Sequence, residues 1–430
     1  MAEFSAQVYQ NEFLPDGGTD VHAIVSITCA GAGTAGQGAG QGAGGDAAEI
    51  VIIDTSGSMH GEKIKAARQA AAAAIEQVLD GTWFAVIAGT EQAKKVFPYR
   101  DAASPMVRME PSARAAVQET VSVLRAGGGT AIGSWLRLAR QLFDTVPSLV
   151  QRHAILLTDG KNQSESAATL DAAVREAQEV FQCDCRGVGA GWNVAELRAV
   201  ATALLGTVDL IPRPEAMAES FATLMRQAMG RGVADATLRV WAPRGATVLF
   251  VRQVSPTVDD LTNRRVSINP LTGGYPTGAW GDESRDYHVA VRLAAKPVGA
   301  EQLAARVQLA IGDQVVASGL VKALWSDDAT LTTRIDPAVA HYTGQAELAE
   351  AIQEGLAAKA AGDEATARVR LGRAVQLAAQ TGDDEATSQL RKVVDVEDAA
   401  TGRVRLRRDV DKLDEMALDT ASTKTTRVKR

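Results

Sequence analysis

The sequence predicts an α/β domain with a mostly parallel sheet, inserted into an antiparallel β-sandwich and followed by a C-terminal α-helical domain. From Glu49 to about Gly230, short apolar runs alternate with amphipathic helical stretches, a pattern that favours a parallel sheet covered on both faces. After Gly230 the helical period gives way to short alternating segments separated by Gly, Pro and Asp, which is typical of a sandwich. From about His341 a helical pattern returns.

The N-terminal segment "DVHAIVSITC" alternates strictly and predicts a half-buried antiparallel strand. Its apolar face carries Val21, Ala23, Val25 and Ile27. This strand has no obvious place in the parallel sheet, so we expect it to pair with the strands after Gly230. Residues 1–30 would then supply the first strands of the sandwich. The following glycine-rich segment, residues 31–47, has almost no side chains able to form a core and is interpreted as a flexible linker.

The predicted domains follow from these changes of pattern. The parallel-sheet domain spans residues 48–230 and the sandwich continues over 231–335. Residues 336–400 form a helical domain, either tetratricopeptide-like or a small bundle, with helix breaks at two Gly-Asp pairs. Residues 401–430 are a basic C-terminal segment ending in "TASTKTTRVKR", which we expect to be mobile. Its threonines are hypothesised to be phosphorylation sites, and solvated charge without a role is the alternative.

Composition excludes several classes of function. The formal net charge of −7 and the isoelectric point near 5.5 argue against nucleic acid as the main partner, because phosphate binding needs a basic face. The three cysteines give no support to a disulfide framework. The sequence has no signal-peptide pattern and no apolar run long enough to span a membrane, so we expect a cytoplasmic protein without a membrane span.

Polar residues gather at the predicted carboxyl ends of two strands. In "VIIDTSGSMHGEK", Asp54, Ser56 and Ser58 follow a run of β-branched residues, and "LLTDG" places Asp159 after another strand. The glycine-rich "GGGTAIG" supplies Thr130. Because ligands of open α/β sheets bind beyond the carboxyl ends of the strands, these oxygen donors are expected to meet there. Oxygen donors without nearby His or Cys suit a hard cation, and a compact octahedral set favours Mg²⁺ over Ca²⁺.

The string "DTSGSM", together with Thr130 and Asp159 in that order, resembles the metal-ion-dependent adhesion site (MIDAS) of von Willebrand factor type A domains. The resemblance covers roughly residues 48–229 and implies a Rossmann-like fold holding Mg²⁺ or Mn²⁺. It implies that Ser56, Ser58 and Thr130 bind the metal directly, and that Asp54 and Asp159 act largely through water. Neutral direct ligands leave most of the positive charge on the metal, so a carboxylate of a partner protein is the expected additional ligand.

We therefore expect a non-enzymatic protein that recognises an acidic group on a protein partner, in assembly or regulation. Multi-domain bacterial relatives with this appearance suggest a Ser/Thr kinase, a phosphatase or a phosphopeptide-binding protein as the partner. One alternative is a docking component of a chelatase-type machine driven by an AAA+ ATPase. The other is a metal-dependent hydrolase, which is disfavoured because the sequence places no general base or nucleophile.

Overall fold

The computed structural model describes residues 2–36, 46–99 and 104–428. Most of the predicted glycine-rich linker, residues 37–45, lies outside the described residues. The chain divides into two compact units. The first contains Ala2, Gly31–Asp235 and Gly278–Asp282, and the second contains Glu3–Ala30, Ala236–Thr277 and Glu283–Arg430.

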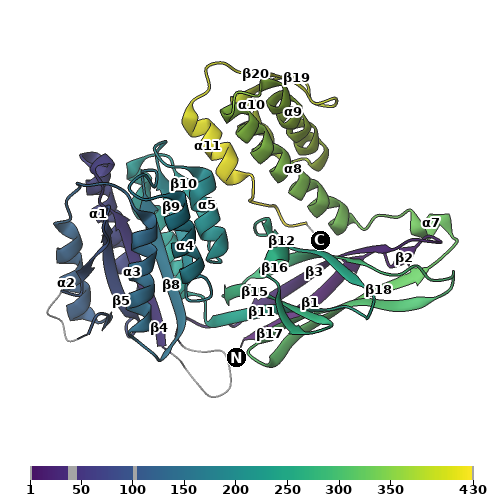
Figure 1. Ribbon diagram of the computed structural model, residues 1–430, viewed down its shortest axis with the longest axis horizontal. Helices are drawn as coiled ribbons and strands as arrows, with labels where there is room; N and C mark the ends of the chain where they lie inside the picture. Colours follow the sequence, from purple (N-terminus) through teal and green to yellow (C-terminus); the bar gives the residue numbers. More distant parts are fainter. Residues whose placement is uncertain (1, 37–45, 100–103, 429–430) are drawn as a thin grey trace. The chain divides into compact units, whose positions relative to one another are not determined.

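The first unit is built on one sheet, in which seven strands are described (Figure 1). The strand order is β10-β9-β8-β4-β5-β6, with β7 also paired to β5. Strands β10, β9, β8, β4 and β5 run parallel, whereas β6 and β7 pair antiparallel with β5. The strands span Asp46–Asp54 (β4), Trp83–Gly89 (β5), Lys94–Phe97 (β6), Val107–Arg108 (β7), Leu149–Thr158 (β8), Gln182–Val188 (β9) and Val208–Ile211 (β10).

Helices cover both faces of this sheet. On one face, α1 (Glu62–Ile75), α2 (Pro111–Ser122) and α6 (Met217–Met229) share an apolar core with the strands. The small side chains of an alanine-rich stretch let α1 pack closely there, and Ala67, Ala70, Ala71 and Ala74 are fully buried. The other face is covered by α3 (Ile132–Asp144), α4 (Ala167–Ala177) and α5 (Val194–Ala203). Short 3₁₀ turns lie at Gly57–Met59 and Pro214–Ala216.

The second unit contains a sandwich of two sheets, whose described strands follow the orders β1-β3-β16-β12-β13 and β14-β15-β11-β17-β18-β2. Strand β3 pairs antiparallel with β1 and β16, which confirms the expected place of the N-terminal strand. The end of β15 and the turn to β16, residues Gly278–Asp282, group with the first unit. The strands span Glu3–Gln10 (β1), Phe13–Leu14 (β2), Asp20–Ala30 (β3), Val233–Trp241 (β11), Thr247–Ser255 (β12), Asp259–Asp260 (β13), Val266–Asn269 (β14), Thr272–Trp280 (β15), Ser284–Arg292 (β16), Glu301–Ile311 (β17) and Gln314–Trp325 (β18).

Helices follow the sandwich, as expected: α7 (Ala329–Thr332), α8 (Pro337–Ala360), α9 (Glu364–Thr381), α10 (Asp384–Val393) and α11 (Lys412–Ala421). The two Gly-Asp pairs separate α8, α9 and α10, because the side chains of Asp363 and Asp383 accept hydrogen bonds from the N–H groups of Thr366 and Ala386. β19 (Val394–Asp398) lies at the end of the region predicted to be helical, and it forms a hairpin with β20 (Arg403–Leu406). Both β20 and α11 lie in the predicted basic C-terminal segment, for which we predicted no helix or strand.

The end of the chain differs from our expectation of a mobile tail. The Val258 N–H donates to the Thr423 carbonyl (2.7 Å), and the Thr425 N–H donates to the Pro256 carbonyl (3.0 Å). The Thr425 hydroxyl also donates to the Val254 carbonyl (2.6 Å). The last described residues are therefore held against the segment that follows β12. Among the described residues, no helix combines the length and the hydropathy needed to cross a membrane.

Candidate metal centre

The first loop of the candidate site starts where β4 ends at Asp54. This side chain is fully buried, and its Oδ1 accepts a hydrogen bond from the Ser56 N–H (2.7 Å). Its Oδ2 accepts from the Thr158 hydroxyl at the end of β8 (2.6 Å). Since β4 and β8 are parallel neighbours, the two strand ends are adjacent and hold one carboxylate between them.

The two serines connect this loop to Asp159. The hydroxyl oxygens of Ser56 and Ser58 lie 3.0 Å apart, and the Ser58 hydroxyl donates to the Asp159 Oδ1 (2.5 Å). The other oxygen of Asp159 accepts a hydrogen bond from the Lys63 ammonium, which comes from the first turn of α1. Ser58 is exposed, whereas Ser56 and Asp159 are buried, so the cluster reaches the surface through Ser58.

The second loop brings Thr130 to the same place. The Gly57 N–H donates to the Gly128 carbonyl (2.9 Å), and the Gly127 N–H donates to the Thr55 carbonyl (2.8 Å). Gly128 has a φ of +84°, a conformation that L side chains rarely adopt, and a side chain there would also collide with Glu91. The glycines therefore allow the two loops to lie against each other.

Three of the side-chain oxygens, from Thr130, Ser58 and Asp54, face a space left by Gly160, the residue after Asp159. A Cβ placed on Gly160 would lie 3.3 Å from the Thr130 Oγ1, 3.4 Å from the Ser58 Oγ and 3.9 Å from the Asp54 Oδ2. The structure thus brings together all five residues that the sequence predicted, at the carboxyl edge of the parallel sheet.

Electrostatics at this site are dominated by the two carboxylates. Burial raises the pKa of Asp54 above its ordinary value, although hydrogen bonds from Ser56 and Thr158 act in the opposite direction. The negative charge of Asp159 adds to the increase in this pKa. Lys63 balances the charge of Asp159, and its side chain remains 36% exposed.

The donor set fits a hard cation that prefers oxygen ligands. The described residues contain no group of three or more His, Cys, Asp or Glu side chains suited to a metal ion, so hydroxyl groups would have to complete any coordination here. Ser56, Ser58 and Thr130 provide such hydroxyls around a cradle that a single Cβ would fill. The position of the Lys63 ammonium also shows that this cluster accommodates a positive charge.

Sequence reasoning missed three residues that shape this site. Thr158 anchors Asp54, Lys63 contacts Asp159, and Gly160 leaves the central space. All three lie inside the quoted segments "VIIDTSGSMHGEK" and "LLTDG". The residue types of Thr158 and Lys63 gave little indication of a role, because a hydroxyl beside a carboxylate and a lysine early in a helix are common on protein surfaces.

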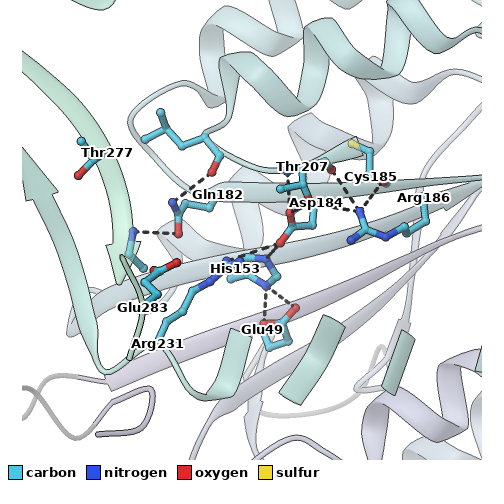
Figure 2. Close-up of polar contacts among 12 residues, drawn as sticks. Glu49, His153, Gln182, Asp184, Cys185, Arg186, Thr207, Arg231, Thr277 and Glu283 are labelled. Carbon is cyan, nitrogen blue, oxygen red and sulfur yellow. Dashed lines mark hydrogen bonds and ion pairs between the residues drawn. The ribbon is translucent and has the colours of Figure 1, made fainter. Parts of the chain in front are cut away.

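A second cluster of charged side chains lies toward the amino ends of the same strands (Figure 2). His153 on β8 contacts both carboxylate oxygens of Glu49 on β4 through Nδ1, at 3.0 and 2.8 Å. Its Nε2 lies 2.9 Å from the Asp184 Oδ2 on β9. Asp184 also accepts hydrogen bonds from the N–H and hydroxyl of Thr207, both at 2.6 Å, and Arg231 lies 3.5 Å away.

Glu49, His153 and Asp184 in this second cluster are buried, whereas the Arg231 side chain is 19% exposed. Burial alone lowers the pKa of His153, but the charge of Glu49 and the hydrogen bonds that the imidazole donates to both carboxylates outweigh it and raise the pKa to about 9. Burial opposes ionisation of Asp184, yet Arg231 and His153 hold its pKa well below the usual range. Because these groups satisfy one another inside the unit, we interpret the cluster as a structural ion network.

Comparisons with known proteins agree on the family. Residues 48–210 match the von Willebrand factor type A domain, and residues 376–422 match the von Willebrand factor type A C-terminal domain. A solved structure described as von Willebrand factor type A from Catenulispora acidiphila is 47% identical, with a TM-score of 0.92 over 99% of this chain and 97% of that one.

More distant relatives support the fold. The ArnB paralog VWA2 from Sulfolobus acidocaldarius is 14% identical, with a TM-score of 0.57 over 98% of each chain, and this likeness concerns the fold alone. An uncharacterised protein of Synechocystis, sll0103, is 29% identical over 216 residues. The chain spans about half the length of this curated relative, at 49%. Since the solved relative from Catenulispora is matched over nearly its whole length, the chain belongs to the von Willebrand factor type A family.

Proposed function

We propose that this protein is a non-enzymatic interaction module that binds an acidic group of a partner protein through a divalent cation. The cation, Mg²⁺ or Mn²⁺, would be held by Asp54, Ser56, Ser58, Thr130 and Asp159. Von Willebrand factor type A domains typically mediate metal-dependent protein interactions, and the family membership of this chain supports that role.

The observation that carries the proposal is the convergence of three side chains around Gly160. Thr130, Ser58 and Asp54 all face a space of atomic size, although Thr130 comes from a different loop than Ser58 and Asp54. Their oxygens suit Mg²⁺, which prefers oxygen ligands and tolerates water in several coordination positions. A bound Mg²⁺ would supply a centre that accepts a carboxylate oxygen from outside the protein.

Charge explains why the partner group is expected to be acidic. A dication and the Lys63 ammonium together exceed the charge of Asp54 and Asp159, so the loaded site would carry net positive charge. The exposed Ser58 provides the side of the site that a partner can reach. A carboxylate of Asp or Glu is therefore the partner group that best completes both the charge balance and the coordination.

The proposed setting is assembly or regulation in the cytoplasm, with a Ser/Thr kinase, a phosphatase or a phosphopeptide-binding protein among the candidate partners. The three cysteines are free and buried, which suits a reducing compartment. Docking onto an AAA+ ATPase, as in chelatase-type machines, is the alternative for the same metal-dependent contact. Hydrolysis remains disfavoured, because Asp54 and Asp159 would both hold the cation and neither would be free to act as a general base.

Calorimetry tests the metal site directly. Mg²⁺ or Mn²⁺ is titrated into the wild type, Asp54→Ala and Asp171→Ala, the last being an exposed aspartate of α4 that serves as a control. We expect binding to the wild type and to Asp171→Ala only. At 100 times the dissociation constant, the metal should also stabilise the unit by about 2.7 kcal/mol. No heat in the wild type at millimolar metal would contradict the proposal.

Affinity capture tests the interaction. The full chain is immobilised and exposed to lysate of its native host in Mg²⁺ or in EDTA, with Asp54→Ala as the matched control. We expect the wild type to retain some proteins only in Mg²⁺. An AAA+ ATPase among them would support the alternative function, docking onto a chelatase-type machine. Identical captured proteins in all three conditions would contradict a metal-dependent contact.

A further inference from the structure

One end of the β-sandwich opens into a pocket of about 520 Å³ between the two sheets of the second unit. Apolar side chains of Val240 on β11 and Val248 on β12 line its walls. Two arginines, Arg244 and Arg265, also line it, and neither has an ion-pair partner among residues 2–36, 46–99 and 104–428. A pocket whose charged groups are all unpaired cations is suited to a negatively charged ligand.

The residue opposite Arg265 is Gly273, and its lack of a side chain leaves room for the arginine at this pocket. A Cβ on Gly273 would lie 2.6 Å from the Arg265 Nε and 3.0 Å from its Cγ, so the arginine occupies the room that Gly273 leaves. Its described polar contact is a hydrogen bond with the neutral Tyr275 hydroxyl. An arginine guanidinium carries donors arranged for a carboxylate, and here those donors face the pocket without one.

The strand that follows Arg265 in the sequence is an open edge. β14 lies at the end of its sheet and pairs only with β15 among the described strands. All of its residues are exposed, with Val266 50% and Ile268 44% exposed. Long exposed edges are ready to pair with another strand, and this one is short but carries two uncovered β-branched side chains.

The two faces of this edge differ in chemistry. The Ile268 side chain lies over Gly274, whereas Arg265 lies over Gly273. Gly273 and Gly274 are successive residues of β15 and face opposite sides of the sheet, so Arg265 and Ile268 also lie on opposite sides. A strand added to β14 would therefore present alternate side chains to a cationic pocket and to an apolar surface.

We infer that this end of the sandwich binds an extended acidic segment of a partner protein, which adds to β14 as a further strand. Its carboxylates pair with Arg265 and Arg244, and its alternate apolar side chains pack beside Val266 and Ile268. Charge supports this occupant, since residues 236–277 contain five arginines and two aspartates in a chain of net charge −7. Main-chain hydrogen bonds supply affinity in such strand addition, and the alternate pockets supply specificity.

The test uses the full chain and a fluorescein-labelled peptide of six residues that alternates valine and glutamate. Binding is followed by fluorescence anisotropy in EDTA, so that a metal at the MIDAS cannot contribute. We expect saturable binding that weakens as NaCl rises from about 50 to 300 mM, because exposed ion pairs are screened by salt. The failure of this experiment would leave the metal-dependent function unaffected, because that function is measured with Mg²⁺ and does not use β14.

Variants assign the binding to this surface. Arg265→Gln and Arg244→Gln should each weaken binding about tenfold, which corresponds to the loss of one charge-assisted contact. Arg368→Gln removes an exposed arginine of α9 and should leave the affinity unchanged. Ile268→Ser should weaken binding about threefold and is exposed enough to leave the fold intact.

Three results would overturn the inference. Equal binding of a valine–glutamine peptide would show that the arginines do not select an acidic segment. Displacement of the labelled peptide by the same concentration of free glutamate or inorganic phosphate would identify a small-anion pocket instead of a strand-binding edge. Unchanged affinity in the Arg265→Gln, Arg244→Gln double variant would place the peptide elsewhere on the chain.

Discussion

The guanidinium of Arg427, near the end of the chain, holds the buried carboxylate of Asp286, 141 residues earlier. Its Nη2 lies 3.2 Å from the Asp286 Oδ1 and its Nε lies 3.3 Å from the Oδ2. The same carboxylate accepts hydrogen bonds from Ser26 on β3 and Tyr342 on α8. One buried acid therefore connects the sandwich, the first long helix of the C-terminal domain and the end of the chain.

Replacing Arg427 should weaken the second unit. Arg427→Ala removes a cation from the buried Asp286 carboxylate, to which the neutral hydroxyls of Ser26 and Tyr342 still donate, and hydrogen bonds to charged groups contribute about 1.5–3 kcal/mol. Because Arg427 is 38% exposed, we expect a loss near the lower end of this range. Thermal melting should show a lower transition temperature than for Arg368→Ala, an exposed control. Equal melting of the two variants would show that the chain end contributes no stability.

The network around His153 makes the first unit sensitive to alkaline pH. Its pKa is raised from an unfolded value near 6.5 to about 9, so the stabilisation is complete below pH 6.5 and is lost as the pH rises through 9. The full loss is about 3 kcal/mol, because each pKa unit corresponds to about 1.4 kcal/mol.

Two measurements check this pH dependence. The imidazole nitrogens of His153 should titrate near pH 9 by nuclear magnetic resonance, and the melting temperature should fall between pH 7 and pH 9. His153→Gln should remove most of that fall while lowering stability at pH 7. A titration midpoint below 7 would show that the neutral histidine is the native form.

Local sequence patterns predicted much of the fold because their physical causes are local. Alternating apolar residues in β3 identify a strand with one buried face wherever its partner lies, and four of the motif residues lie at or just after strand ends. Asp54, Ser56, Ser58 and Asp159 could be found in this way, whereas Thr130 lies in the glycine-rich loop between α2 and α3 and was found through the resemblance to the family motif.

The features that were missed depend on distant contacts. The segment after residue 422 contains threonines and basic residues, which indicate a solvated tail, yet Thr425 and Arg427 find partners at Val254 and Asp286. No local property of the tail encodes those partners. The role of Gly160 is similar, because its importance comes from the Thr130 side chain that approaches it from another loop.

Filling the space at Gly160 should weaken metal binding without unfolding the chain. The added Cβ of Gly160→Ala would lie within 4 Å of oxygens from Thr130, Ser58 and Asp54, so we expect at least a tenfold loss of Mg²⁺ affinity by calorimetry. Gly127→Ala is a matched control in the neighbouring loop, since a Cβ there meets no atom within 4 Å. Equal affinity of both variants would place the metal elsewhere.

The contact between Lys63 and Asp159 leads to the last prediction. The ammonium and a dication would share the same carboxylate, and like charges a few ångströms apart repel by about 1 kcal/mol even in a water-like medium. Lys63→Gln removes the charge and keeps a polar side chain that is one atom shorter, so Mg²⁺ affinity should rise about fivefold, and the gain should shrink at high salt.

Lys65→Gln provides the control for this variant, because Lys65 lies on the same helix and pairs only with the exposed Glu62 among the described contacts. Calorimetry on both variants separates two roles for Lys63. If the ammonium competes with the metal, affinity rises only in Lys63→Gln. A fall in affinity would instead show that Lys63 holds Asp159 in the orientation that the metal requires, and this lysine would then be a positioning residue of the site.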